Sequence, residues 1–546
     1  MTKNIARLPQ GCAALWFLAA IATCVAPSPA AASPLQVQLP SGRAIGQPNS
    51  DGVYAFLGIP YARAPEGRLR FMPPLPPPRS SRTVNDLTPN AACAQPTDPQ
   101  WAHLYPPVRE DCLRASIWTP RLETSARLPV VVWIHGGGFM GGSAVSPRYD
   151  GGAFSRRGGV VFVGINYRLG PLGFLDLSGH GGDPASGNLG ILDQVRALEW
   201  VRDNIARFGG DPSNVTVMGE SAGGTSIVAL LTLPSAKGLF HKAIIMSGPT
   251  QYVRSPPFAA KVTEEFMRRA GASTAAQLQS MSIDKIYRAQ LDLMHAVHED
   301  LELFGPVVDG KVVRDYPLRA IQRGDFTKVP VLHGTTQDET RLWQQFTTEF
   351  NDHTAEDLLL NVRPALRNAI GADRVRSLVA TYASDLPAQS LHDLTFTVTN
   401  DQWFRIPHVR LGEALAAQGV PNWLYIFTWA TTMTTPSGLP LKSAHSIELP
   451  FVLHNLRKGD AAQFVTDKPP EALADLAQDT WIAFVKNGDP NNAGLPPWSP
   501  YDARTRATMR IDTEPRIMND PGSVLRKAWD GVPFDGVVPR SEWNPK

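Results

Sequence analysis

The amino-acid sequence predicts an α/β protein built on a large, mostly parallel sheet with helices on both faces. Continuous apolar runs of strand length recur along the chain, and segments with helical periodicity lie between them. A parallel sheet produces this alternation because crossover helices cover both of its faces. Of the 546 residues, 43% are hydrophobic and 19% are charged, as in a globular protein with a large core. No repeat, low-complexity linker or break in composition divides the chain, so one domain spanning residues 33–546, with helical insertions, is expected.

The first 32 residues resemble a cleaved export signal. Lys3 and Arg7 give a basic start, Cys12–Val25 is an apolar run, and an Ala-Ala-Ala cleavage site precedes Ser33. The apolar run is short for a membrane span, although a retained anchor is the alternative. We therefore expect a secreted or periplasmic protein, and no later segment reads as transmembrane. Cleavage removes one Lys and one Arg, which brings the formal net charge of +2 to about 0 and argues against nucleic-acid or anionic-membrane partners.

The sheet is predicted from the N-terminal side onwards. Residues 34–71 alternate apolar and polar between turn signals, which indicates an antiparallel edge. Six apolar runs then predict the buried, mostly parallel strands: Leu128–His135, Val160–Asn166, Val215–Gly219, Ala243–Ser247, Val329–His333 and Trp423–Thr428. From Pro496 onwards the pattern indicates irregular or edge structure.

Helices are predicted between and after these strands. The segment from Leu189 to Phe208 has apolar residues near helical spacing, and a Gly-Gly-Asp-Pro run ends it. Residues 250–480 are richer in helical patterns, among them Val262–Ala270, Ala355–Ile370 and Glu471–Val485.

Two cysteines remain in the mature chain, because Cys12 and Cys24 leave with the signal. In an exported protein, Cys93 and Cys112 most simply form one disulfide, and two buried free thiols are the alternative. The loop between them holds Trp101.

A candidate nucleophile lies where the predicted strand Val215–Gly219 meets a helix-compatible run. The chain reads Gly219-Glu220-Ser221-Ala222-Gly223, a Gly-x-Ser-x-Gly motif. A serine on a sharp strand-to-helix turn needs small neighbours, and the helix that follows directs its amides at the group under attack. A chance match in a flexible loop is the alternative.

A serine nucleophile also needs donors for the oxyanion that develops on the substrate. The strand ending at His135 runs into a glycine triplet followed by Phe139. Glycines let backbone amides approach a ligand closely, so Gly137 and Gly138, with Ala222, are the predicted oxyanion hole. A flexible glycine turn is the alternative.

The base must be one of 12 histidines. His445 follows a Gly/Pro-rich loop and can reach a serine, whereas His241, His333 and His408 belong to apolar segments and suit structural roles. The acid should lie between serine and histidine in chain order, beyond a strand end. Asp338 and Glu339 both qualify, and the residues alone leave the choice open; either could instead be a helix N-terminal charge.

Taken together, the chain resembles the type-B carboxylesterases, which belong to the α/β-hydrolase fold and include cholinesterases and bile-salt lipases. The resemblance spans residues 34 to 540, and its matching stretches are Phe56–Ala62, Leu69–Phe71, Glu110–Leu113, Trp133–Phe139, Asn166–Arg168, Gly187–Gly190 with Asp193 and Gln194, Gly219–Gly224 and His445–Phe451.

The resemblance implies a Ser-His-Glu triad of Ser221, His445 and Glu339 rather than Asp338, acting through an acyl-enzyme. It implies the oxyanion donors named above, supports the disulfide, and places Glu220 beside the triad. It also implies two buried ion pairs that orient loops, Arg70–Glu110 and Arg168–Asp193.

Two positions depart from the family pattern: Arg114-Ala115-Ser116 replaces a Tyr-Leu-Asn-like run, and Thr340 follows Glu339 where glycine is usual. Neither touches a predicted proton-transfer partner. Candidate pocket residues are Glu220, Trp101, Tyr252 and Phe304, with Trp343 and Phe404 as further wall candidates, and core packing is the alternative for the aromatic ones.

The function predicted is hydrolysis of a small-molecule carboxylic ester, with no cofactor, since no Cys/His cluster has metal-ligand spacing. A lipase, a lactonase, or a specialised esterase for a polycarboxylate or mycotoxin ester on the same fold is the main alternative, and a non-catalytic binding protein is the more remote one.

Overall fold

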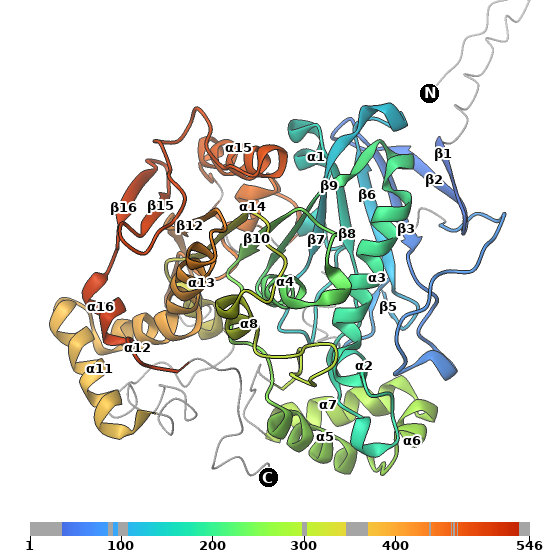
Figure 1. Ribbon diagram of the computed structural model, residues 1–546, viewed down its shortest axis with the longest axis horizontal. Coiled ribbons are helices and arrows are strands. Elements are labelled where there is room, and N and C mark those ends of the chain that lie inside the picture. Colours follow the sequence, from blue (N-terminus) through green and yellow to red (C-terminus); the bar gives the residue numbers. More distant parts are fainter. Residues whose placement is uncertain are drawn as a thin grey trace, which may run out of the picture. The chain divides into compact units, whose positions relative to one another are not determined.

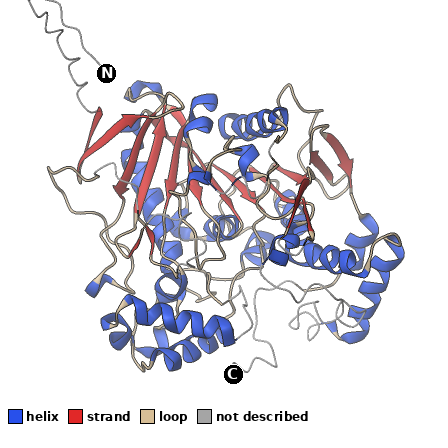
Figure 2. Cartoon of the chain, turned by 180° about the vertical axis from the view of Figure 1, so that it is seen from behind, coloured by secondary structure: helices blue, strands red, loops and turns tan. Residues whose placement is uncertain are grey.

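A computed structural model describes residues 35–85, 91–96, 107–296, 303–345, 370–435, 438–459, 461, 465–466 and 468–533. A twelve-stranded sheet runs through these residues, with helices on both sides (Figures 1 and 2). Along the chain its strands are β1 Leu35–Leu39, β2 Gly42–Pro48, β3 Tyr54–Pro60, β6 Arg114–Thr119, β7 Leu128–Ile134, β8 Val161–Ile165, β9 Gly210–Glu220, β10 Lys242–Met246, β11 Val331–Thr336, β12 Asn422–Phe427, β15 Ala507–Ile511 and β16 Arg516–Asn519.

The strand order across the sheet is β1-β2-β3-β6-β8-β7-β9-β10-β11-β12-β15-β16. All pairs from β8 to β15 are parallel, whereas the pairs from β1 to β8 and the final pair β15–β16 are antiparallel. This confirms the predicted fold class, the antiparallel N-terminal edge and all six apolar strands. Strand β6, which joins that edge to the parallel part, was not among the predicted strands. From Pro496 onwards only irregular or edge structure was expected; β16 is an edge strand, but β15 lies inside the sheet between β12 and β16.

Helices cover both faces of the sheet. The longer ones are α3 Leu189–Asn204, α4 Ala222–Thr232, α5 Pro256–Ala270, α7 Ile283–Ala296, α11 Ala372–Asp385, α12 Leu391–Asn400, α13 Ile406–Ala417 and α15 Glu471–Asn487. Shorter ones are α1 Gly152–Gly158, α2 Gly170–Phe174, α6 Ala275–Ser280, α8 Pro317–Arg323, α14 Leu449–Val452 and α16 Ser523–Ala528. The helices predicted from Leu189, Val262 and Glu471 are confirmed, and Ala355–Ile370 lies outside the described residues except for Ile370.

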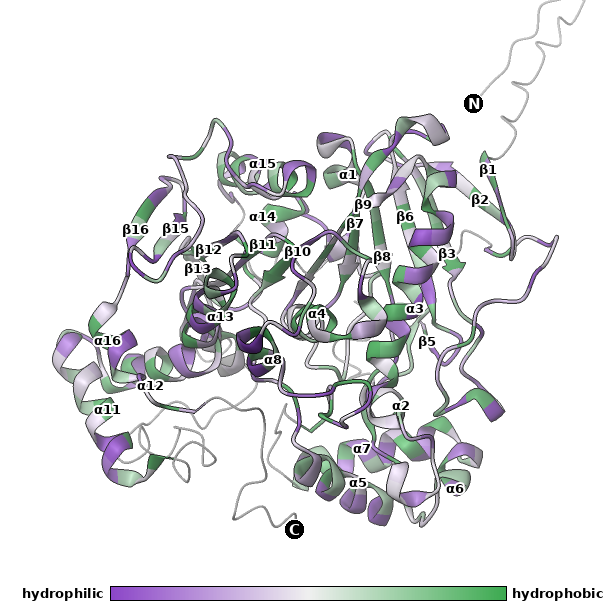
Figure 3. Ribbon diagram, in the orientation of Figure 1, coloured by the Kyte–Doolittle hydropathy of each residue, from purple (hydrophilic) through white to green (hydrophobic). Residues whose placement is uncertain are grey.

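Two large apolar cores lie on opposite faces of the sheet. Strand β7 contributes to both, because Val130, Val132 and Ile134 belong to one core while Val131 and Trp133 belong to the other. Successive strand residues point to opposite faces, so a strand buried on both sides must be apolar throughout. The hydropathy colouring shows the resulting concentration of hydrophobic residues in the central strands (Figure 3).

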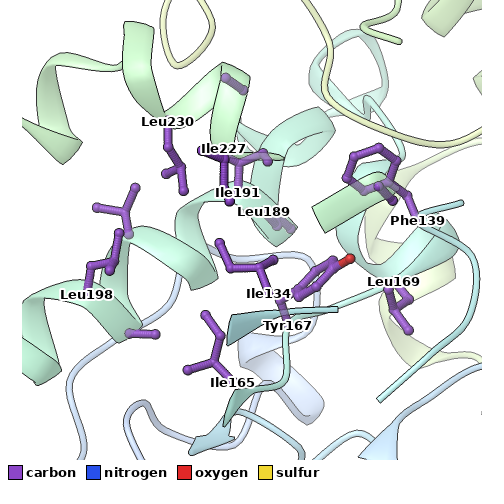
Figure 4. Close-up of a cluster of buried hydrophobic side chains, with 14 of the residues drawn as sticks. Ile134, Phe139, Ile165, Tyr167, Leu169, Leu189, Ile191, Leu198, Ile227 and Leu230 are labelled. Carbon is purple, nitrogen blue, oxygen red and sulfur yellow. The ribbon is translucent and has the colours of Figure 1, made fainter. Parts of the chain in front are cut away.

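The first core packs α3 and α4 against the centre of the sheet. Leu189 and Leu198 of α3 and Ile227 of α4 face Ile134 and Ile165 at the strand ends (Figure 4). These side chains are fully buried. The packing fixes the start of α4 against the ends of β7 and β9, which is where the candidate nucleophile and its glycine-rich partner loop lie.

No helix among the described residues has the length and apolar character needed to cross a membrane.

Candidate active site

The candidate nucleophile lies on a sharp turn between β9, which ends at Glu220, and α4, which begins at Ala222. Ser221 has φ 57° and ψ −122°, a strained conformation for a residue with a side chain. The turn leaves no room at the flanking glycines: a Cβ on Gly219 would lie 2.7 Å from the carbonyl carbon of Gly223, and one on Gly223 would lie 2.0 Å from the Ile134 oxygen. The small residues of the motif are therefore a steric requirement of this turn.

The glycine-rich loop after β7 lies directly against this turn. A Cβ on Gly136 would lie 2.9 Å from the Ser221 Cβ, so the two backbones are in close contact. Gly137 and Gly138 have φ values of 105° and 61°, which favour glycine. Within the described residues their amides donate no hydrogen bond, and the Ala222 amide opens α4, where the first N–H groups have no partner in the helix. The three predicted oxyanion donors thus lie in the two segments that meet at Ser221 and Gly136.

His445 and Glu339 are brought together from loops that follow different strands. The Nδ1 atom of His445 lies 2.5 Å from Oε2 of Glu339, and both side chains are buried. The other carboxylate oxygen of Glu339 accepts a hydrogen bond of 2.8 Å from the Thr336 amide. The His445 amide also donates to the Glu339 carbonyl oxygen at 3.1 Å. A backbone hydrogen bond thus joins the two residues beside their side-chain contact.

The structure distinguishes Glu339 from Asp338, the neighbour that the residues alone left as an equal candidate. The Asp338 carboxylate turns away from the imidazole, accepts a hydrogen bond from the Ser443 amide at 3.3 Å and lies 3.5 Å from Nε of Arg341. Of the carboxylates in the described part of the chain, it is that of Glu339 that contacts His445 Nδ1.

A second carboxylate faces the other imidazole nitrogen. Oε1 of Glu220 lies 3.1 Å from Nε2 of His445 and accepts a hydrogen bond of 2.6 Å from the Ser446 hydroxyl. Burial opposes a charged imidazole, but the carboxylates of Glu220 and Glu339 outweigh it and raise the pKa of His445 to about 9. Among the described residues the Ser221 hydroxyl has no hydrogen-bond partner. In this structure Nε2 therefore faces Glu220 rather than Ser221.

Glu448 adds a third buried carboxyl group that the sequence analysis did not single out. It is fully buried, and its Oε1 accepts a hydrogen bond of 3.4 Å from the Ser247 hydroxyl. Burial, together with the charges of Glu220 and Glu339, raises the pKa of Glu448 well above its usual value and favours its protonated form. In the sequence, the only feature that associates Glu448 with the site is its position three residues after His445.

Aromatic rings form the surroundings of the imidazole. The rings of Trp343 and Phe404 lie 5.1 and 5.2 Å from the His445 ring, and they stack on each other at 5.9 Å. Both residues were wall candidates. Phe404 belongs to a π-helical turn, Asp401–Arg405, which also brings Trp403 to 6.2 Å from Trp343. Sequence periodicity gave no indication of this turn.

The remaining pocket candidates lie elsewhere. Tyr252 is almost completely buried and stacks on Phe139 at 6.4 Å, next to the glycine-rich loop. Phe304 is fully buried against Phe266 of α5, at 6.4 Å between ring centroids. Trp101 lies outside the described residues. Their roles in a substrate pocket stay predictions.

Together these groups have the composition needed for acyl transfer: a hydroxyl on a strained turn, amides beside it, and a histidine oriented by a carboxylate. The sequence model of the carboxylesterase family matches residues 33–526. The chain belongs to the carboxylesterase family. Carboxylesterases are ester hydrolases of the α/β-hydrolase fold, and the described sheet and helices agree with that fold.

Similar proteins support the same assignment. The chain is 38% identical over 487 residues to the para-nitrobenzyl esterase of Bacillus subtilis, covering 87% of this chain and 95% of that one. It is 32% identical over 465 residues to the fumonisin B1 esterase of Sphingopyxis macrogoltabida, covering 83% and 82%. Among solved structures, the Geobacillus stearothermophilus carboxylesterase EST55 superposes with a TM-score of 0.80 at 36% identity, covering 90% of this chain and 99% of that one.

The structural links expected of this carboxylesterase are present. Cys93 and Cys112 form a disulfide, as predicted. The Arg70 guanidinium binds both oxygens of Glu110, at 2.6 and 2.5 Å. Arg168 binds both oxygens of Asp193, at 2.8 and 2.7 Å. Among the described residues, no group of three or more histidine, cysteine, aspartate or glutamate side chains is arranged to hold a metal ion.

Proposed function

We propose that this carboxylesterase cleaves small neutral esters through a triad of Ser221, His445 and Glu339, with the amides of Gly137, Gly138 and Ala222 as the oxyanion hole. The observation that carries the proposal is the 2.5 Å contact between His445 Nδ1 and Glu339, in a histidine whose other nitrogen faces the residue before Ser221. The proposed reaction requires Ser221 Oγ to take the place of Glu220 at Nε2. Hydrogen bonds of this kind often form only with substrate bound.

The chemistry follows from these positions. His445 takes the Ser221 proton as Oγ bonds to the ester carbonyl carbon, and the carbonyl oxygen becomes an oxyanion held by the three amides. The imidazolium, stabilised by Glu339, then gives its proton to the departing alcohol, which leaves an acyl-Ser221. Water attacks this acyl group with His445 again as base, which releases the carboxylic acid and restores the serine.

The surroundings of His445 support an apolar or aromatic substrate group. The rings of Trp343 and Phe404 lie next to the imidazole, tilted to it by 35° and 46°, and bring no charge of their own. An ester with an apolar acyl or alcohol group would bury its surface against these rings. Export of the mature chain, residues 33–546, to the periplasm or the medium belongs to the same proposal, and it is supported by the composition of residues 1–32.

The test is hydrolysis of a p-nitrophenyl ester series, acetate through palmitate, by the mature protein and its Ser221→Ala variant. The proposal predicts activity that is highest on short chains and falls by at least about 10⁴-fold in Ser221→Ala. Circular dichroism and the unfolding midpoint of the variant should match those of the wild type, because only an oxygen atom is removed.

Other outcomes discriminate among the related hydrolases. Activity that rises toward palmitate would indicate a lipase. A folded wild-type protein with no activity on any chain length would contradict the general-esterase proposal and leave a specialised substrate or a binding role.

A further inference from the structure

A buried arginine lies two residues after the proposed triad acid. Arg341 belongs to the 3-10 turn Glu339–Gln345 and its side chain is only 2% exposed. Burying a guanidinium is costly unless anions compensate it. Here two carboxylates do so: Nη2 pairs with Asp393 of α12, and Nε lies 3.5 Å from Asp338. The Arg341 guanidinium also lies 5.1 Å from the ring of Phe396, on the same helix.

The same carboxylates bind the loop that carries His445. Asp393 Oδ1 lies 3.1 Å from the Lys442 ammonium. Asp338 donates from its amide to the Ser443 carbonyl at 2.9 Å, and its carboxylate accepts from the Ser443 amide at 3.3 Å. Because Lys442 and Ser443 are adjacent in the chain, the contacts close a ring. We call this the Arg341 ring; its members are Asp338, Arg341, Asp393, Lys442 and Ser443.

The two triad residues are joined directly to this ring. Glu339 lies between Asp338 and Arg341 in the chain, and His445 follows Ser443 by two residues. The ring therefore sets the separation of the backbones that carry the carboxylate and the imidazole. Thr340 supports the same geometry, since its hydroxyl donates to the Phe396 carbonyl oxygen at 3.2 Å and anchors the turn to α12.

We propose that Arg341 is a positioning residue for the triad, which holds the Glu339 loop against the His445 loop through its shared carboxylates. The inference rests on the proposed function, because it assigns Arg341 a role through Glu339 and His445. Arg341 touches neither of their side chains among the described contacts, so its effect on the rate is indirect. A displacement near 1 Å in a catalytic group can cost about 100-fold in rate.

The test compares Arg341→Met with Arg341→Lys on a p-nitrophenyl ester, with kcat and KM measured across pH. Arg341→Met should lower kcat about ten- to a hundred-fold with KM changed less than about threefold, because positioning acts on the chemical step. Its acid limb in kcat/KM should shift to lower pH, because a looser Glu339 contact stabilises the imidazolium less. Arg341→Lys, which keeps the positive charge, should retain part of the wild-type kcat. Its acid limb in kcat/KM should lie close to the wild-type pH.

The matched control is Arg526→Met. The Arg526 side chain is 11% exposed and binds both oxygens of Asp520, at 2.7 and 2.9 Å. Among the described ion pairs, neither Arg526 nor Asp520 contacts the Glu339 loop or the His445 loop. Arg526→Met should lose stability like Arg341→Met and keep the wild-type kcat and acid limb. If Arg341→Met also keeps both, the ring has only a structural role and the inference is overturned.

Two further variants cover failure of Arg341→Met to fold. Lys442→Met and Asp393→Asn break the ring at other points, and the Lys442 side chain is 40% exposed, so its loss should be tolerated. Each should lower kcat about threefold or more and shift the acid limb in the same direction; wild-type limbs in both would overturn the inference.

Glu339→Gln separates the hypothesis about the triad from the hypothesis about Arg341. If it keeps wild-type kcat, the triad itself is wrong; if it loses activity while the ring variants do not, only the role of Arg341 is wrong.

Discussion

At the scale of single residues, the site is defined by how carboxylates surround one imidazole. Glu339 and Glu220 face the two nitrogens of His445, at 2.5 and 3.1 Å. In the proposed mechanism, the first contact fixes the tautomer of His445 and stabilises the imidazolium that forms during proton transfer. The second contact favours the charged imidazole in the resting protein, so it opposes the proposed role of His445 as a base.

This competition predicts the pH dependence of the reaction. His445 accepts a proton only when neutral, and its pKa is raised to about 9, so kcat/KM should increase with pH up to that region. Glu220→Gln removes a negative charge next to Nε2, destabilises the imidazolium and lowers the pKa of His445. The acid limb of kcat/KM should therefore move to lower pH, as measured on a p-nitrophenyl ester from pH 5 to 10.

A surface variant serves as the control for this effect. The Glu471 side chain is 56% exposed, and Glu471→Gln removes one negative charge at a position screened by solvent. Glu471→Gln should leave the acid limb of kcat/KM unchanged. An acid limb in Glu220→Gln that stays in place or moves upward would contradict the electrostatic account of His445.

The residues alone pointed to Ser221 and His445 as candidates but could not separate Glu339 from Asp338 without the family resemblance. Both carboxylates follow the end of β11, and adjacent residues on a turn differ only in the direction of their side chains. That direction depends on partners far away in the chain, namely Ser443 for Asp338 and His445 for Glu339. The burial of Glu448 beside His445 and the contacts of Arg341 with the two loops could not be predicted, because their partners also come from distant segments.

At the scale of elements, the turn between β9 and α4 holds Ser221, the proposed nucleophile, in its strained conformation. The turn depends on glycines whose missing side chains leave space for other backbone atoms. Gly223 is the most constrained of them, since a Cβ there would lie 2.0 Å from the Ile134 oxygen. Backbone at such a position cannot move aside as a flexible side chain could.

Gly223→Ala should therefore destabilise the fold by about 3 kcal/mol or more, as overpacking against backbone does. The matched control is Gly179→Ala, where the added Cβ would have no neighbour within 4 Å, and a change within about 0.5 kcal/mol is expected. Urea unfolding monitored by circular dichroism gives both values. Equal unfolding midpoints for the two variants would show that the turn is not as tight as described.

Strands were predicted more completely than other elements, for a physical reason. A strand buried on both faces needs an unbroken apolar run, as in β7 and β8, and such runs are visible in the sequence. Strand β6 was missed because it begins with Arg114 and Ser116, and its burial comes from its neighbours β3 and β8. The π-helical turn Asp401–Arg405 has no local signal either, since tertiary contacts stabilise it.

At the scale of the whole molecule, the fold brings together parts that are far apart in the chain. The glycine-rich loop, the proposed nucleophile turn and the proposed acid follow β7, β9 and β11 of the sheet. The proposed histidine lies in the long connection after β12, beyond the small antiparallel pair β13 (Thr431–Thr434) and β14 (Pro440–Lys442). Parallel strands place their carboxyl ends at one edge of a sheet, so loops after different strands converge there. The order of the strands in the sheet, however, depends on the packing of both cores. The sequence therefore predicted the fold class but not the strand order.

The proposed export concerns the whole chain, and it gives a prediction about the mass of the mature protein. If residues 1–32 are removed on export, the protein recovered from the periplasm or medium of a bacterial host should begin at Ser33. Intact-mass spectrometry should then give the mass of residues 33–546. An exported protein that keeps Met1, or one found only in the membrane fraction, would contradict the predicted cleavage.

The central claim is that Ser221 is the nucleophile, and covalent labelling tests it most directly. A fluorophosphonate should react with Ser221, forming an Oγ–phosphorus bond with loss of fluoride, because the base and oxyanion donors that serve an ester also serve this reagent. Peptide mass spectrometry should show one adduct per chain, on the peptide that contains Ser221, with loss of activity in proportion and no adduct in Ser221→Ala. Labelling of a different residue, or full activity after complete labelling of Ser221, would contradict the account.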